Sequence, residues 1–284
     1  WKVSPCVLEQ GINIHAWHNN AAPISAQTNG TQVPGTPPKP YTIVAMQLLE
    51  SGARSLGYPL DAEQMDRFER YRRVLLQWNK RFNLTAIDSP EGIEVRHFLD
   101  CLSALRALDS EPGFPGDVRL LDIGSGAGFP GIPLKIAVPA LSVTLLEATG
   151  KKVAFLKHAA EALQLNCISA IHGRAEDRAH ETGLREAFHA VVARAVAPLA
   201  VLCELGLPFV QVGGLFIAMK KGDTLAELEH AASAMAQLGG QLEDRIEIEL
   251  PGLTDERHII CIRKTGPTPV RFPRRPGIPA RKPL

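Results

Sequence analysis

The sequence lacks several features that would restrict its class. Its five cysteines include no Cys-x-x-Cys pair, which argues against a zinc knuckle or a disulfide scaffold and favours a reducing compartment. No apolar run approaches the roughly 18 residues that a membrane span needs. Lys and Arg total 31 against 30 Asp and Glu, so no excess of charge draws the whole chain to nucleic acid or membrane. We therefore expect a cytoplasmic protein that contacts no membrane.

The first part of the chain, residues 1–45, differs from the rest. It is rich in Asn, Gln, Thr and Pro, shows no periodicity, and does not begin with Met. It also lacks the basic start and apolar core of a signal peptide. We expect a disordered extension or a wrongly assigned start, and exclude it from the fold.

Residues 46–116 favour an N-terminal helical cap. Asp61 and Gln64 have the spacing of a capping box at a helix start. An apolar stripe at steps of three or four follows, which we expect to be core: Met65, Phe68, Tyr71, Leu75, Trp78 and Phe82. The opposite face carries Arg67, Arg70, Arg73, Lys80 and Arg81. A second helix is expected from Ser89-Pro90, with Pro suited to the first turn.

Residues 117–264 alternate between short apolar runs and helical patterns. The expected strands are 118–123, 142–147, 167–172, 190–194, 215–220, 245–250 and 258–263. The expected helices are 131–138, 151–164, 176–186, 198–209 and 223–238. This alternation predicts an α/β fold, a parallel sheet with helices on both faces.

Residues 265–284 hold five basic side chains, six prolines and no acidic side chain. The prolines argue against a helix, so we expect a basic, extended C-terminal arm.

A glycine-rich loop joins the first expected strand to the next helix. The residues Asp122-Ile123-Gly124-Ser125-Gly126-Ala127-Gly128 run from the strand end into the turn, where glycines let the backbone approach a ligand closely. Glu147 ends the next strand, where a carboxylate can accept hydrogen bonds from both hydroxyls of a ribose. Phe129 replaces the third glycine of a dinucleotide fingerprint, which favours a cofactor without phosphate. The loop resembles the S-adenosylmethionine loop of Rossmann-like, seven-stranded methyltransferases.

Further motifs narrow the resemblance to one family. In chain order they are Trp78–Ala86, Arg96–Asp100, the glycine loop, Ala193–Ala195, Ala218–Lys220, Arg257–His258 and Pro273–Pro279. Over residues 46–284 the chain is similar to the bacterial small-subunit (16S) ribosomal RNA guanine-N7 methyltransferases, also called glucose-inhibited division protein B. It departs from them at Cys101, where the family often has Ser, and in residues 1–45.

The resemblance implies a set of site residues. For S-adenosyl-L-methionine they are Gly124, Gly126, Phe129, Glu147, Ala148, Thr149, Ala175, Glu176 and Arg194. Candidate contacts to substrate RNA are Arg96, His97, Lys220, Arg274 and Arg275. The implied partner is 16S rRNA or the small ribosomal subunit, with no metal and a monomeric enzyme.

Ring-nitrogen methylation agrees with the residues present. After the fourth expected strand the chain reads Ala193–Pro198, without the Asn/Asp-Pro-Pro-aromatic motif that polarises an exocyclic amine. Cys203, in an apolar helix, is a poor nucleophile for carbon methylation. Guanine N7 has a free lone pair, so no general base is needed, and alignment of the reactants contributes up to roughly 7–11 kcal/mol.

Other interpretations stay open. The Arg-rich helix face is more often simply solvated, and His97 with Asp100 can be an ordinary buried hydrogen bond. A further alternative is that Arg194 has no role at the site and only forms an ion pair with Glu176 or Asp100. A small-molecule or protein methyltransferase is the alternative among enzymes, and a non-catalytic ribosome assembly factor is the alternative outside them.

Overall fold

The computed structural model describes residues 46–194 and 197–284, so the expectation for residues 1–45 lies outside the described residues. None of the helices in these two ranges is long and apolar enough to cross a membrane. The same residues contain no cluster of three His, Cys, Asp or Glu side chains arranged for a metal ion.

The helical cap precedes the sheet. It contains α1 (Gln47–Ser55), α2 (Ala62–Phe82), α3 (Pro90–Ile93), the π-helix η1 (Glu94–Leu99), α4 (Asp100–Leu102) and α5 (Leu105–Leu108). The predicted capping box is present at the start of α2: Asp61 accepts from Gln64 N at 2.8 Å, and Gln64 Oε1 accepts from Asp61 N at 2.8 Å. Asn83, in the left-handed region, ends the helix.

The apolar stripe of α2 is core over most of its length. Phe68, Tyr71 and Leu75 are fully buried, and the Tyr71 hydroxyl donates to Ala127 O in the glycine loop. The expectation for Phe82 was wrong, because its side chain is 37% exposed. Phe82 lies in the last turn of the helix, where it contacts Trp78 and the Lys151 side chain instead of the sheet.

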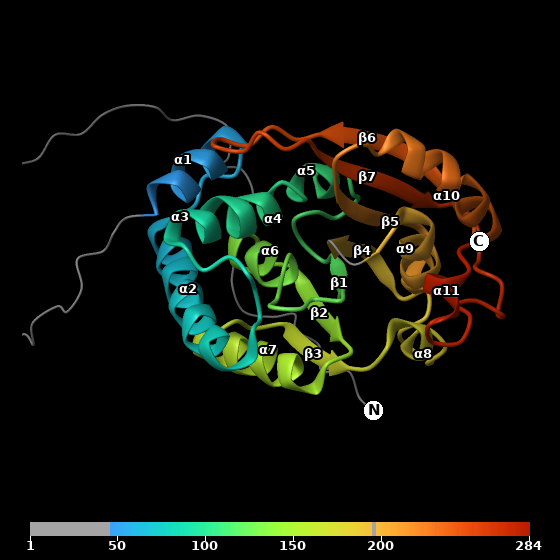
Figure 1. Cartoon of the computed structure of the whole chain (residues 1–284), viewed down its shortest axis with the longest axis horizontal. Helices are drawn as coiled ribbons and strands as arrows, with labels where there is room; N and C mark the ends of the chain where they lie inside the picture. Colours follow the sequence, from blue (N-terminus) through green and yellow to red (C-terminus); the bar gives the residue numbers. More distant parts are fainter. Residues whose placement is uncertain (1–45, 195–196) are drawn as a thin grey trace, which may run out of the picture. The chain divides into compact units, whose positions relative to one another are not determined.

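A seven-stranded sheet forms the centre of the molecule, in the order β3-β2-β1-β4-β5-β7-β6 (Figure 1). Its strands are β1 (Arg119–Ile123), β2 (Ser142–Glu147), β3 (Ile168–His172), β4 (Phe188–Arg194), β5 (Val210–Lys221), β6 (Gly240–Glu247) and β7 (Arg257–Lys264). The fold is therefore the predicted α/β methyltransferase fold. The expectation of an all-parallel sheet was wrong at β7, which runs antiparallel to β5 and β6. No helix lies in the β6–β7 connection, and a short return of this kind gives an antiparallel pair.

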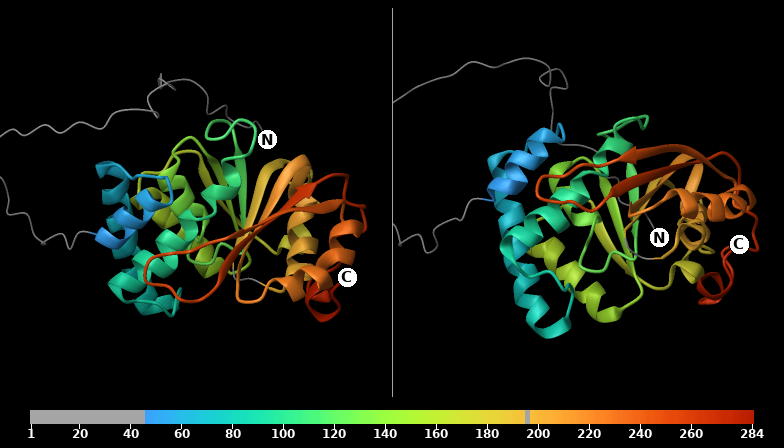
Figure 2. Two further views of the ribbon diagram at one scale, coloured as in Figure 1. Left: turned by 90° about the horizontal axis from the view of Figure 1, so that it is seen from above. Right: turned by 45° about the horizontal axis from the view of Figure 1, so that its top comes forward.

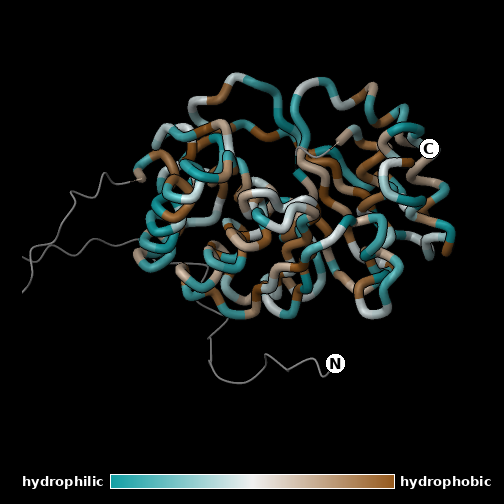
Figure 3. The backbone as a smooth tube through the Cα atoms, turned by 60° about the horizontal axis from the view of Figure 1, so that its bottom comes forward, coloured by the Kyte–Doolittle hydropathy of each residue, from teal (hydrophilic) through white to brown (hydrophobic). Residues whose placement is uncertain are grey.

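Helices cover both faces of the sheet, as the two views of Figure 2 show. The remaining helices are α6 (Gly131–Ala137), α7 (Gly150–Ala162), α8 (Ala175–Arg178), α9 (Leu199–Gly206), the 3₁₀ turn η2 (Leu207–Phe209), α10 (Leu225–Gln237) and α11 (Ile278–Arg281). Alternate strand residues point to opposite faces, so Leu120 packs with the α2, α6 and α7 side and Leu121 with the α9 and α10 side. In Figure 3 many of the hydrophobic stretches lie in the interior, and hydrophilic stretches are frequent on the outer helices and loops.

Four predicted elements differ from the structure. The strand expected at 215–220 is β5, which begins five residues earlier, at Val210. The helix expected at 176–186 is only α8, because turns with left-handed Gly183 and Glu186 follow it. The strand expected at 245–250 is β6, which begins five residues earlier, at Gly240. The C-terminal arm is neither extended nor free of helix: α11 forms with Pro279 in its first turn, and Phe272 is buried.

Candidate cofactor and substrate site

The glycine loop lies between the carboxyl end of β1 and the start of α6. Gly124 N and Ser125 N donate to Leu146 O, which fixes the loop beside β2. Gly126 has φ +57°, and a Cβ built on it would make only an ordinary van der Waals contact, 3.7 Å from Gly124 O. Gly131 is needed for close packing, since a Cβ there would lie 2.4 Å from Leu145 Cδ2. Gly126 therefore needs glycine for its left-handed backbone, whereas Gly131 needs it for tight packing.

Glu147 connects the loop to the next helix. Its Oε2 accepts from Gly126 N at 2.9 Å and its Oε1 accepts from Thr149 N at 2.8 Å. Each oxygen keeps a further lone pair, so the carboxylate remains able to accept hydroxyl hydrogens. Ala148 lies between these contacts, and its carbonyl oxygen is 3.0 Å from His172 Nε2.

Asp122 lies fully buried beneath the loop. Its Oδ2 accepts from Gly131 N at 3.0 Å, whereas Oδ1 has no partner among the described residues. Burial raises the pKa of this carboxyl to about 7. Two carboxylates, Asp122 and Glu147, therefore meet at one edge of the sheet. Acidic side chains at this edge fit a cofactor that carries a sulfonium and an ammonium group.

The predicted adenine-side residues follow β3. Ala175 and Glu176 form the first turn of α8 and are buried. Glu176 Oε1 accepts a hydrogen bond from Gly277 N at 3.1 Å, so the C-terminal segment reaches this end of the sheet.

Arg194, at the end of β4, is the centre of a polar cluster. Its Nη2 lies 2.7 Å from Asp100 Oδ2 and donates to Arg96 O at 2.6 Å. Its Nη1 lies 3.3 Å from Cys101 Sγ. Asp100 also pairs with Arg257, whose Nη2 contacts Asp255 at 2.9 Å. The cluster holds the Arg194 side chain in one orientation between the cap and the sheet.

An aromatic stack lies beside this cluster. The rings of His97 and Phe129 are 4.4 Å apart at 22°, and the Arg194 guanidinium is 5.6 Å from the Phe129 centroid. Burial, and next the charge of Arg194, lowers the pKa of His97 to about 3, so the imidazole is neutral. Its Nδ1 has no partner in the described part of the chain. A neutral imidazole at this edge can stack or donate one hydrogen bond, but it is a weak base.

His97 is held from the end of α2. Its Nε2 is 2.7 Å from Thr85 Oγ1, and Asn79 bonds both the N–H and the carbonyl of Thr85 at 2.9 and 3.0 Å. His97 and Asp100 do not pair, which excludes the simple hydrogen bond considered from their spacing. Sequence reasoning missed Thr85 as the partner of His97 and Asn79 as the residue that holds Thr85, although both lie in the Trp78–Ala86 motif.

The residues predicted to contact RNA fall into two groups in the structure, those that are exposed and those that pair with acidic side chains. Arg96 and Arg275 are exposed. Lys220 instead pairs with Glu227 at 2.7 Å and donates to Ala197 O at 3.1 Å. Arg274 pairs with buried Glu204 at 2.6 Å. Lys220 and Arg274 thus already have protein partners, whereas Arg96, next to His97, is available at the site.

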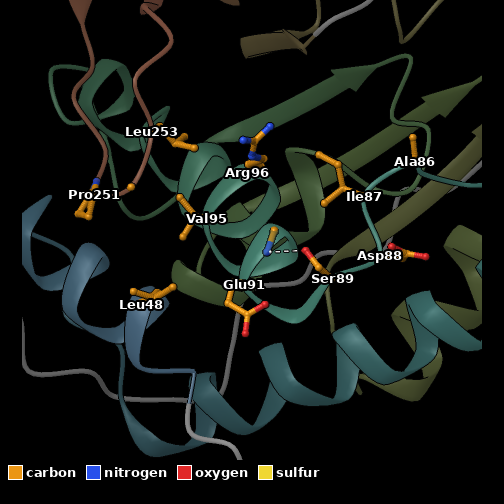
Figure 4. A pocket seen from close by; sticks show the side chains of 12 residues that line it. Leu48, Ala86, Ile87, Asp88, Ser89, Glu91, Val95, Arg96, Pro251 and Leu253 are labelled. Carbon is orange, nitrogen blue, oxygen red and sulfur yellow. Dashed lines mark hydrogen bonds between the residues drawn. The ribbon is translucent and has the colours of Figure 1, made fainter.

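Arg96 also lines a groove of about 500 Å³ (Figure 4). The groove lies between α1, the loop before α3, η1 and the β6–β7 connection, and Leu48, Ser89 and Pro251 contribute to its walls. It does not include the glycine loop or Glu147.

Comparisons with known proteins agree on one family. The model of the family described as rRNA small subunit methyltransferase G matches residues 64–260. Ribosomal RNA small subunit methyltransferase G of Dehalococcoides mccartyi (strain CBDB1) is 46% identical over 239 residues, covering 84% of this chain and 100% of that protein. The protein with the same description from Bacillus cereus (strain AH187) is 41% identical, covering 84% and 98%.

Solved structures give more distant matches. A ribosomal protein L11 methylase from Lactobacillus delbrueckii subsp. bulgaricus is 14% identical, with a TM-score of 0.45 over 60% of this chain and 79% of that one. TrmN from Thermus thermophilus is 20% identical, with a TM-score of 0.44 over 60% and 53%.

Proposed function

Because the chain belongs to the rRNA small subunit methyltransferase G family and is an S-adenosylmethionine-dependent methyltransferase, we propose that it methylates N7 of one guanine in a loop of 16S rRNA. The observation that supports this atom is the composition of the edge beside the glycine loop. It holds a buried aromatic stack, His97 on Phe129, and a neutral imidazole whose pKa of about 3 makes it a weak base. Guanine N7 needs no base, because its lone pair is free at neutral pH.

S-adenosylmethionine supplies the methyl group: the N7 lone pair forms the new N–C bond as the C–S bond breaks, leaving S-adenosylhomocysteine and a positively charged N7-methylguanine. The chain's residues hold and orient the reactants, which lowers the barrier by alignment. Glu147, at the end of β2, brings a carboxylate to the edge that takes the cationic cofactor.

The proposed cofactor contacts are those implied by the resemblance. Gly124 and Gly126 border the amino-acid part, Glu147 holds the ribose hydroxyls with Ala148 and Thr149 beside it, and Ala175 and Glu176 flank the adenine. Phe129 and Arg194 complete the cofactor contacts at the edge where ligands of open sheets bind. Within the proposed RNA contacts, exposed Arg96 and Arg275 and the unpaired Nδ1 of His97 are favoured over Lys220 and Arg274, which have carboxylate partners.

A duplex substrate does not suit this reaction. The deep, narrow major groove of A-form RNA hides N7, so the guanine has to lie in a loop or be extruded. We propose the small ribosomal subunit or its rRNA as partner, and a monomeric, cytoplasmic enzyme that needs no metal. We also propose that residues 46–116 act as a cap on the 117–264 methyltransferase domain.

The deciding experiment uses radiolabelled S-adenosylmethionine and small subunits from a strain that lacks this modification. Strand scission specific for N7-methylguanosine then maps the label. Label at one loop guanine is the expected result. Label elsewhere in the RNA contradicts the atom or the site, and cofactor binding without transfer to subunits or rRNA favours a small-molecule or protein substrate. Subunit binding without cofactor binding favours the assembly factor.

A further inference from the structure

The last residues of the chain are attached closely to the sheet domain. We call residues 268–282 the C-terminal strap. Arg185 donates to the carbonyl oxygens of Thr268 and Phe272 at 2.8 and 2.9 Å, and Glu186 accepts from Thr268 N at 2.7 Å. His180 Nε2 lies 2.9 Å from Pro273 O. Phe272 completes the attachment by entering the core on the α9 side.

A buried ion pair holds the middle of the strap. Glu204 of α9 is fully buried, and its carboxylate accepts from Arg274 N at 2.8 Å, Nε at 2.9 Å and Nη2 at 2.6 Å. Arg274 Nη2 also donates to Lys282 O at 2.7 Å, which closes the strap on itself. A buried carboxylate is costly without partners, so Glu204 and Arg274 depend on each other.

The strap then reaches the adenine side of the proposed cofactor pocket. Gly277 has φ +81°, a backbone conformation that residues other than glycine rarely adopt. Its N–H donates to Glu176 Oε1 at 3.1 Å. Glu176 Oε2 makes no hydrogen bond to the described residues. One carboxylate oxygen is thus fixed by the strap, and the other is left to accept a hydrogen bond.

We propose that the C-terminal strap is part of the adenine-recognition site, and that Glu204 and Arg274 are positioning residues for Glu176. By holding Gly277 N–H in place, the ion pair orients the Glu176 carboxylate so that Oε2 accepts from the 6-amino group of the adenine. This inference rests on the proposed placement of the adenine beside Glu176. It gives the basic C-terminal segment a role in cofactor selection that an RNA-binding arm would not have.

The test compares two ligands that differ at the recognised group. S-adenosylhomocysteine carries a 6-amino group, whereas S-inosylhomocysteine carries a 6-oxo group that cannot donate to a carboxylate. Calorimetry on the full chain gives both dissociation constants. We expect Arg274→Ala to raise the dissociation constant for S-adenosylhomocysteine about tenfold. The dissociation constant for S-inosylhomocysteine should change less than about twofold. Arg274→Lys keeps the positive charge but loses the two-pronged guanidinium contact with Glu204. It should therefore retain part of the preference for S-adenosylhomocysteine that Arg274→Ala loses.

A matched ion pair at the opposite end of the sheet serves as the control. Arg263 pairs with Glu111 at 2.8 Å, and the side chains are 24% and 3% exposed, against 27% and 1% for Arg274 and Glu204. Arg263 also pairs with exposed Glu243 at 2.5 Å, so Arg263→Ala removes at least as many arginine–carboxylate contacts without touching the strap. It should leave both dissociation constants unchanged.

Each outcome of this ligand comparison either supports or overturns the proposed role of the strap. Unchanged ligand preference in Arg274→Ala overturns the inference, as does an equal loss of both ligands or an equal effect of Arg263→Ala. If circular dichroism shows that Arg274→Ala does not fold, Glu204→Gln, which keeps an acceptor but loses the charge, is judged by the same ratio. A wild-type protein that binds neither ligand contradicts the proposed function itself.

Discussion

Glu147 accepts two backbone hydrogen bonds at the junction of the glycine loop and α7, and in the proposed function it also holds the ribose. Glu147→Ala removes the ribose acceptor and leaves Gly126 N and Thr149 N without their partner. We expect the affinity for S-adenosylmethionine to fall more than about tenfold, measured by isothermal titration calorimetry.

Glu161→Ala is the control for this substitution, since Glu161 is exposed on α7 and lies outside the loop. It should bind the cofactor like the wild type. Unchanged affinity in Glu147→Ala would refute the ribose assignment.

His97 should make stability depend on pH. Burial and the charge of Arg194 lower its pKa from 6.5 to about 3 in the folded state, so below pH 6.5 the unfolded chain binds more protons there. Stability from this group is complete above pH 6.5 and is lost as the pH falls towards 3. Between pH 7 and pH 5 the free energy of unfolding should fall about 2 kcal/mol more in the wild type than in His97→Gln.

Urea unfolding at the two pH values, each with its own fitted slope, measures this difference. The comparison with His97→Gln cancels the contributions of other titrating groups, among them Asp122, whose raised pKa acts in the opposite direction. Equal losses in both proteins would contradict the buried, neutral state of His97.

At the scale of elements, α2 divides its basic residues into two groups. Arg67 and Arg70 pair with Glu63 and Asp66 one turn earlier, at 2.6 and 2.7 Å. In the part of the chain that the structure describes, no carboxylate pairs with Lys80 or Arg81 in the last turn. Next to them are exposed Phe82 and Lys151, whose Nζ is 6.0 Å from the Phe82 centroid.

We therefore expect RNA binding to involve only the end of α2. The double variant Lys80→Ala/Arg81→Ala should weaken binding to small-subunit rRNA and reduce the slope of log K against log salt by about 1–2, roughly 0.7–0.9 per lost phosphate contact. Fluorescence anisotropy at several salt concentrations measures both quantities.

Arg67→Ala/Arg70→Ala removes the same number of charges from the same helix and serves as the matched control. Because these arginines already have partners, their loss should leave the salt slope near the wild-type value. Equal slopes in the two double variants would show that the paired and unpaired residues of α2 do not differ in RNA binding.

At the scale of the whole molecule, Asp100 joins the cap to two strands of the sheet. It follows the π-helix and pairs with Arg194 at the end of β4 and with Arg257 at the start of β7. Asp100→Ala would remove the counter-charge that partly buried Arg194 and buried Arg257 share, leaving Asp255 as the acid beside Arg257. Removing one partner of a buried pair typically costs about 3–5 kcal/mol, and we expect a loss of this size in urea unfolding.

Asp88→Ala provides the comparison, because Asp88 is an exposed acid of the same cap. Its free energy of unfolding should change by less than about 0.5 kcal/mol. A similarly small effect of Asp100→Ala would mean that the cap and the sheet are held together mainly by their apolar contacts.

Much of the fold could be predicted from the sequence, because the signals are local. The capping box at Asp61 and the apolar period of α2 depend on residues within a few turns of one another. The bounds of β2 agree with its prediction, since one apolar run ends at a single acid, Glu147. The glycine spacing after β1 indicated a methyltransferase loop for the same reason.

The tertiary structure decided the features that depend on residues far apart in the chain. The direction of β7, the pairing of Asp100 with Arg194 and Arg257, and the partner of His97 all join segments whose approach no local pattern encodes. The C-terminal segment shows the difference most clearly: its prolines and arginines predicted an extended arm, yet Arg274 finds buried Glu204 70 residues away. A charged side chain is stable either in solvent or beside a buried counter-charge. Which of the two locations has the lower free energy depends on the folded chain, because only folding brings the counter-charge close.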